Sequence, residues 1–355
     1  MVLGASICSA TTSEQPLSFR LFSSILQEHE GNVFFSPAGV EAILTSLKKY
    51  SAGQTLDELN ALNIPEAKTH FNISVQQADG LFVSEKLALK PTVTDAVKIN
   101  FENSAHAADT INTWCTERTN GLINQLVQAS DFSSLTAFVA TNAIYMKSDW
   151  LYPFRENESF TGSFTTADGK KSPVKMMSNT AKYPVARGKD WVAIALPYKA
   201  TQNTGEHCYF VAICPMGDAR KFATTLTGEK YSNILTTLSQ ESARVQLIMP
   251  RFTLEGDTLN LNDALKAAGL TKIFTRADFS GLLAESRDDI FLQAVLQKCY
   301  VKVDETGTEA AAATAAIAQF RSMPRTISLN RPFIWMITDL SGNSTPLFMG
   351  IYEQP

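Results

Sequence analysis

The sequence predicts a single domain that contains both helices and strands, and three observations support this prediction. The chain has 355 residues, of which 45% are hydrophobic and 19% charged, as in ordinary globular proteins. Some segments space their apolar residues as helices do, whereas others are short β-branched runs typical of strands. No linker rich in Pro, Gly or Ser divides the chain, and no repeat of fixed period occurs.

Charge and composition exclude several classes of protein. The formal net charge of −4 gives no reason to expect nucleic acid or an anionic membrane as a partner. No stretch approaches the roughly 18 to 20 apolar residues of a membrane span. The sequence has no Gly-x-Ser-x-Gly, His-Glu-x-x-His, Walker or Gly-x-Gly-x-x-Gly motif, so neither an enzyme nor a cofactor is expected.

The cysteines predict neither a disulfide framework nor a metal site. Their number is odd, they are scattered, and none is spaced as Cys-x-x-Cys; they are Cys8, Cys115, Cys208, Cys214 and Cys299. The last three lie in apolar strand-like runs, where a free cysteine behaves as a small hydrophobic residue.

Residues 1–15 are interpreted as a leader remnant or a disordered terminus, and residues 16–355 as the domain. The first ten residues are apolar and end in Cys8-Ser9-Ala10, which is similar to the end of a secretory signal peptide, although a positive leading region is missing. An extracellular location is therefore favoured, with a cytoplasmic one left open.

The periodicity of apolar residues predicts the main elements. A first helix is expected over residues 17–27, with Pro16 at its start. Residues 32–37 are expected to form a strand that turns into a helix, because Pro37 suits a first helical turn. Strands are expected at residues 81–84, 87–89, 192–198, 208–214 and 245–250.

The segment from residue 304 to 332 contrasts with its apolar surroundings, because residues 308–318 are nearly all small. Alanine is the best helix former, so one interpretation is an exposed helical or disordered linker. In the other interpretation the period is two, and one face carries Thr308, Ala310 and Ala312. Such a strand could slide between two existing strands at little steric cost.

This segment resembles the hinge and reactive-centre loop of the serpin family. The hinge residues are Glu305, Gly307, Thr308, Glu309, Ala310, Ala311 and Ala312. Counting from Glu305 with the family's usual loop length places the cleaved bond between Arg321 and Ser322. Asn330-Arg331-Pro332-Phe333 lies where the family resumes its fold, and counting back from it gives the same bond.

The resemblance extends from about residue 16 to the end. Residues 32–37, 111–123, 141–147, 261–274 and 346–350 are each similar to a block of the family. It implies an α+β fold with three β-sheets, about eight or nine helices, an exposed reactive-centre loop over about residues 305–329, and a metastable native state. The block at 111–123 implies a helix lying across the large sheet.

A buried polar cluster is also implied by the resemblance. In the family such a cluster keeps the two middle strands of the large sheet closed, and here it would contain Ser36, Asn142 and Gln297. Gly39 replaces a second serine of the family, and Gln297 replaces a histidine. Glutamine both donates and accepts hydrogen bonds, so bonding in a different form is expected.

The resemblance implies a suicide-substrate inhibitor that traps a trypsin-like serine protease in a covalent complex. Arg321 fits a specificity pocket floored by a carboxylate, and the bulky Phe320 precedes it. Papain-like cysteine proteases are alternative targets, and a non-inhibitory serpin used for transport, storage or chaperoning is an alternative class. Small residues throughout 307–313 favour an inhibitor.

No strong dependence on heparin is expected, and a monomer is expected. Serpins activated by heparin carry a basic face on an early helix. The corresponding residues 57–72 contain Lys68 and His70 as their basic residues.

Overall fold

The computed structural model describes residues 15–65, 72–202, 207–285, 287, 289–307, 324–342 and 344–355. Helices and strands occur in separate layers, which confirms the α+β class. Within these residues the α-helices are α1 (Leu17–Glu28), α2 (Pro37–Tyr50), α3 (Gly53–Ala61), α4 (Ser104–Arg118), α5 (Ala219–Thr224), α6 (Gly228–Gln240) and α7 (Asn262–Ala267), and the 3-10 turns are Ala129–Asp131, Glu156–Glu158 and Lys272–Phe274.

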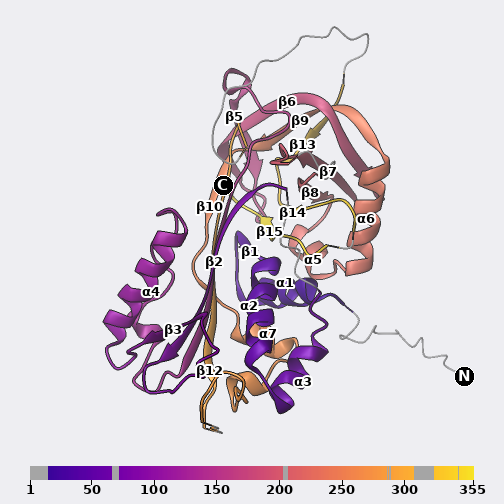
Figure 1. Ribbon diagram of the computed structural model, residues 1–355. Helices are drawn as coiled ribbons and strands as arrows, with labels where there is room; N and C mark the ends of the chain where they lie inside the picture. The colour runs from indigo at the N-terminus through magenta and orange to yellow at the C-terminus, as the bar shows by residue number, and fades with distance from the viewer. Residues whose placement is uncertain are drawn as a thin grey trace, which may run out of the picture.

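A six-stranded sheet runs along the molecule (Figure 1). Its strand order is β10-β12-β4-β2-β3, with β11 also paired to β12. The strands are β2 (Ser74–Ser84), β3 (Ala96–Ile99), β4 (Phe138–Lys147), β10 (Phe252–Glu255), β11 (Leu259–Asn260) and β12 (Leu292–Val303).

A nine-stranded sheet has the order β1-β15-β14-β8-β7-β6-β9-β13, with β5 paired to β6. The long β6 pairs with β5 and β9 along most of its length and with β7 only at its end, so it joins two sheets into one. The strands are β1 (Val33–Phe35), β5 (Phe160–Thr165), β6 (Lys171–Arg187), β7 (Trp191–Pro197), β8 (Tyr209–Pro215), β9 (Ser242–Pro250), β13 (Arg325–Ser328), β14 (Phe333–Thr338) and β15 (Phe348–Tyr352).

Helices cover both faces of the six-stranded sheet. Figure 1 shows α4 on one face and α1, α2, α3 and α7 on the other. The apolar side of α4 packs on this sheet through residues such as Ile111 and Cys115, which confirms the helix predicted across it. On the opposite face α2 contributes Val40, Ile43 and Leu47 to the largest core. Apolar side chains on both faces therefore fix the sheet between two helical layers.

Most predicted elements are present, with one correction. Residues 87–89 are not a strand: Leu87 closes a turn through its N–H to the carbonyl of Ser84, and Leu89 makes only an isolated bridge to Leu283. The turn ends β2 at Ser84, so these leucines pack against the core without a ladder. No helix within the described ranges is long and apolar enough to cross a membrane.

Candidate functional site

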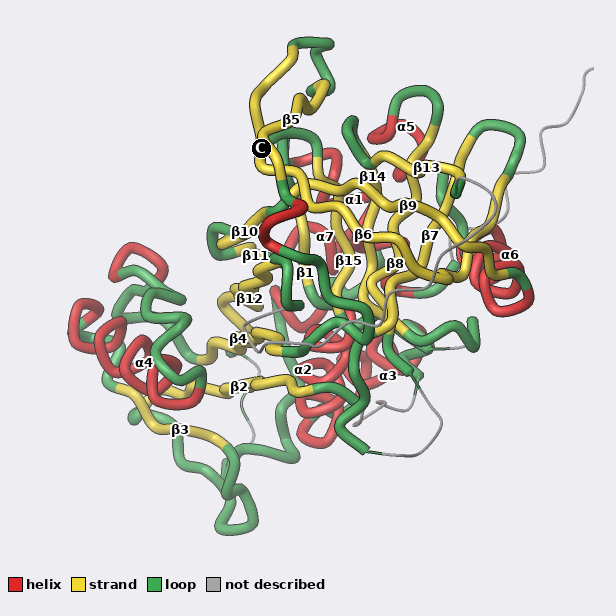
Figure 2. Tube along the Cα trace, turned by 90° about the horizontal axis from the view of Figure 1, so that it is seen from above, coloured by secondary structure: helices red, strands yellow, loops and turns green. Residues whose placement is uncertain are grey.

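The two central strands of the six-stranded sheet, β4 and β12, are parallel neighbours. They pair from Phe138 with Leu292 to Tyr145 with Tyr300, and Figure 2 shows them side by side. Every other neighbouring pair in this sheet except β2 and β3 is antiparallel. A segment that folded back from the end of β12 and entered between β4 and β12 would be antiparallel to both, and would replace one parallel ladder with two antiparallel ones.

The hinge begins where β12 ends, and its glutamate is buried. Glu305 is 3% exposed. One carboxylate oxygen accepts a hydrogen bond from Ser159 Oγ at 2.8 Å and lies 3.6 Å from Lys175 Nζ, and the other lies 3.5 Å from Arg251 Nη1. These partners neutralise the buried carboxylate and hold the start of the hinge on β6 and on the turn before β10.

Trp150, just beyond β4, holds the backbone of the hinge. Its Nε1 donates to the carbonyl of Asp304 at 2.9 Å, and its backbone N–H donates to the carbonyl of Thr306 at 2.9 Å. The indole ring stacks on Tyr198 with 4.5 Å between ring centroids. The end of β12 is thus fixed to the end of β4.

Gly307 requires glycine for two reasons. Its φ of +143° is a conformation that other residues rarely adopt. A Cβ atom there would overlap the carbonyl oxygen of Ser148 and the backbone of Asp149. At Gly307 the backbone of the hinge therefore lies in close contact with the backbone of residues 148–149.

The structure brings together the three residues of the predicted polar cluster. Gln297 on β12 accepts a hydrogen bond from the Ser36 N–H at 2.8 Å and donates Nε2 to the Ser36 carbonyl at 3.0 Å and to Asn142 Oδ1 at 2.8 Å. Ser36 Oγ donates to the Leu347 carbonyl at 2.6 Å and, as the N-cap of α2, accepts from the Gly39 N–H at 3.0 Å. Gln297 is 1% exposed, so this cluster joins α2, β4 and β12 inside the core.

Asp79 and Gly39 also belong to this cluster, and Asp79 was not predicted from the sequence. Asn142 Nδ2 donates to Asp79 Oδ1 on β2 at 2.6 Å. The hydrogen-bonded side chains therefore connect three strands, β12, β4 and β2. A Cβ atom at Gly39 would overlap Asn142 Oδ1, so the missing side chain at Gly39 makes room for this asparagine. Asp79 keeps part of its side chain exposed, and desolvation by the surrounding protein raises the pKa of its carboxyl against the hydrogen bonds from Asn142 and Gln77.

The far end of the predicted loop is also placed. Residues 325–328 form β13, which pairs in parallel with β9, and Arg331 Nε donates to the Pro215 carbonyl at 3.1 Å. The remaining predicted site residues lie outside the described residues; they are Thr308, Glu309, Ala310, Ala311, Ala312, Phe320, Arg321 and Ser322.

The model of the family described as "Serpin (serine protease inhibitor)" matches residues 12–355. The chain belongs to the serpin family. Serpins are protease inhibitors and in general not enzymes. The match includes the hinge, the polar cluster and both central strands.

Curated serpins and solved serpin structures match nearly the whole chain. An uncharacterised serpin-like protein of Thermococcus kodakarensis is 31% identical over 93% of this chain and 82% of its own length. Plasminogen activator inhibitor 1 of Sus scrofa is 26% identical over 98% of this chain and 95% of its own. Native protease nexin-1 with heparin has a TM-score of 0.82 at 25% identity, covering 97% of this serpin and 98% of that chain. Uncleaved ovalbumin, at 20% identity and a TM-score of 0.80, shows the fold alone.

Proposed function

We propose that this serpin is a suicide-substrate inhibitor of trypsin-like serine proteases, cleaved between Arg321 and Ser322. The observation that carries the proposal is the direct parallel pairing of β4 and β12, with the hinge leaving the end of β12. After cleavage, the hinge segment can fold back beside β12 and enter the sheet as an antiparallel strand.

The chemistry begins as ordinary proteolysis. The protease serine attacks the carbonyl carbon of Arg321, the bond to Ser322 breaks, and Ser322 leaves as a protonated amine while the arginine stays esterified to the enzyme. The freed segment from Gly307 to Phe320 then inserts. At ~3.3 Å per residue, about 15 residues carry the ester some 50 Å along the sheet. Misplacement of the catalytic residues stops hydrolysis of the ester.

Insertion first has to break contacts that the structure shows. The Gln297 to Asn142 hydrogen bond crosses the gap between β12 and β4, and Trp150 ties the hinge to the end of β4. These bonds keep the sheet closed before cleavage. Two antiparallel ladders then replace one parallel ladder, which compensates for their loss.

Arg321 sets the proposed specificity. A guanidinium pairs with the carboxylate at the base of a trypsin-like specificity pocket. The name of the relative plasminogen activator inhibitor 1 states inhibition, which supports an inhibitory role. Lys68 and His70 remain the basic residues of segment 57–72, so we propose no large acceleration by heparin.

Mixing the purified protein with trypsin tests the proposal. We expect a complex that survives SDS, with mass spectrometry placing the new amino terminus at Ser322. Arg321→Ala should fold normally and lose this complex, because the change removes the group that enters the specificity pocket. Complexes with papain but not with trypsin would favour the cysteine-protease alternative. Cleavage without any complex would favour a non-inhibitory serpin.

A further inference from the structure

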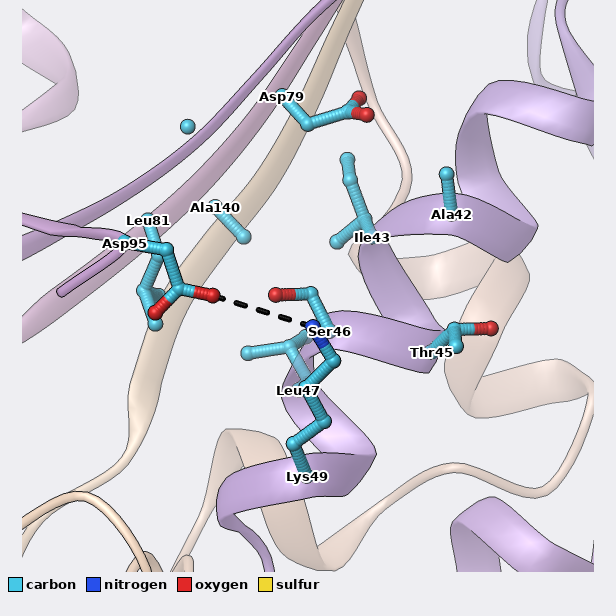
Figure 3. Close-up of a pocket in the computed structure, with 11 residues that line it drawn as sticks. Ala42, Ile43, Thr45, Ser46, Leu47, Lys49, Asp79, Leu81, Asp95 and Ala140 are labelled. Carbon is cyan, nitrogen blue, oxygen red and sulfur yellow. Dashed lines mark ion pairs between the residues drawn. The ribbon is translucent and has the colours of Figure 1, made fainter. Parts of the chain in front are cut away.

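A pocket of about 320 Å³ lies between α2 and the strands β2 and β4, away from the hinge (Figure 3). Its apolar wall includes Ile43 and Leu47 of α2, Leu81 of β2 and Ala140 of β4. Two carboxylates, Asp79 and Asp95, also line it. A largely apolar pocket of this size with a few polar groups is the usual form of a small-molecule site.

The two carboxylates have different partners. Asp95 lies 4.0 Å from Lys49 Nζ and accepts a hydrogen bond from the Tyr50 hydroxyl. Asp79 accepts hydrogen bonds from the amides of Asn142, at 2.6 Å, and Gln77, at 2.8 Å, and neither donor is a cation. The pocket lining carries two carboxylates, Asp79 and Asp95, and one ammonium, Lys49, so its net charge is −1. A ligand with a single positive charge is therefore complementary to it.

We propose that this pocket binds a small organic ammonium ion, with the ammonium on Asp79 and an apolar body against Ile43, Leu47 and Leu81. An amine on Asp79 would favour the ionised carboxylate, and the protein around this group otherwise raises its pKa. The apolar wall excludes ligands that are mainly polar.

In the proposed function, loop insertion moves β2 and β4, which form one wall of the pocket, relative to β12. The start of α2 is tied to β12, because both backbone groups of Ser36 bond to Gln297. The strands β2 and β4 stay paired through a continuous register from Ser74 to Val83. Inserting a strand moves β4 away from β12 by about 4.8 Å. The pocket therefore changes shape whenever the sheet opens.

It follows that a ligand fitted to the closed pocket stabilises the closed sheet. By linkage, a ligand that binds one state better than another shifts the equilibrium toward that state. Such a ligand would slow insertion and turn the inhibitor toward substrate behaviour. This regulatory half of the inference rests on the proposed function, whereas the binding half does not.

Calorimetric titration with 2-phenylethylamine, with the neutral 2-phenylethanol as matched probe, tests the binding. We expect the native protein to bind the amine at least ~10-fold more tightly than the alcohol, because the alcohol lacks the charge-assisted bond to Asp79. Asp79→Asn keeps an acceptor for Asn142 and should lose this preference. Ser46→Phe, at the centre of the pocket in Figure 3, should remove binding of both probes. Equal affinity for the two probes, or an unchanged preference in Asp79→Asn, overturns the inference.

Hydrogen exchange tests the coupling without any protease. The amine should slow exchange of the amides paired between β4 and β12 in the wild type and leave them unchanged in Asp79→Asn. With trypsin present, it should raise the number of inhibitor molecules consumed per protease trapped. Unchanged exchange under saturating amine contradicts the coupling. If the protein traps no protease at all, the titration and the exchange experiment still decide this inference.

Discussion

At the scale of single residues, the burial of Glu41 gives the native state a dependence on pH. Glu41 lies on α2, is 4% exposed, and accepts a hydrogen bond from Thr345 Oγ1 at 3.0 Å. Burial raises the pKa of its carboxyl from 4.5 to about 7, and the hydrogen bond from Thr345 opposes this shift only in part. The native state therefore holds this proton more tightly than the unfolded state does.

Between pH 4.5 and about 7 the unfolded chain releases the Glu41 proton while the native protein keeps it, so the contribution of Glu41 to stability falls as pH rises through this window. The difference between the two pKa values corresponds to at most roughly 3 kcal/mol. We predict that Glu41→Gln, which keeps an acceptor for Thr345, reduces the loss of stability between pH 5 and pH 8. At pH 8 this variant should melt at a higher temperature than the wild type. Thermal unfolding at pH 5 and pH 8 checks this. A wild-type melting temperature that falls no more than that of the variant would contradict the prediction.

A second prediction at this scale concerns the space beside Gly39. The family usually has serine here, but a Cβ atom would overlap Asn142 Oδ1. We predict that Gly39→Ser lowers the free energy of unfolding by roughly 1–3 kcal/mol, because Asn142 has to leave Gln297 or Asp79. The same change in an Asn142→Ala background should cost less, since the overlapping atoms are gone. Equal costs in the two backgrounds would refute the steric explanation.

At the scale of elements, the strands and helices best predicted from the sequence were those that a single local pattern identifies, such as a proline at a helix start or apolar residues at helical spacing. Pro37 marked the start of α2, and the apolar spacing marked α1. The polar cluster was expected only because of a family resemblance. Asp79 was not predicted, because nothing in the local pattern of β2 indicates that Asn142 on another strand reaches it. The pattern at Leu87 to Leu89 was misinterpreted, because apolar residues that pack without a ladder resemble a strand.

The alternation of the hinge predicts which of its residues insertion buries. Counting from Gly307, Thr308 should enter the sheet facing the core, whereas Glu309 should face water. We predict that Thr308→Arg is cleaved after Arg321 and released without a stable complex, because insertion would bury an unpaired charge at a cost of several kcal/mol. Glu309→Ala is the matched control and should trap protease normally. If Thr308→Arg forms as much SDS-stable complex as the wild type, the assumed direction of these side chains is wrong.

At the scale of the whole molecule, the proposed function requires a sheet that is closed before cleavage and open to one more strand afterwards. Gln297, Asn142 and Ser36 hold its centre, and Glu305 and Trp150 hold its upper end. Both sets of contacts cross from β12 to other elements. In the proposed function, separation of β4 from β12 is therefore the step on which trapping of a protease depends.

A reversible covalent clamp across these two strands tests this step most directly. Cys299 on β12 is the register partner of Ile144 on β4, and both side chains lie in the same core cluster. Paired positions on neighbouring strands suit a disulfide, so Ile144→Cys can be oxidised to a cross-link and confirmed by intact mass. Ile144→Ser, which cannot cross-link, is the control for the altered core.

The measurement compares oxidised Ile144→Cys with the same protein reduced and desalted, each mixed with trypsin and run on an SDS gel. We predict that the reduced protein forms a covalent complex, whereas the oxidised protein is cut after Arg321 and released, because its sheet cannot open. A complex formed equally by both forms would show that trapping does not require β4 and β12 to separate.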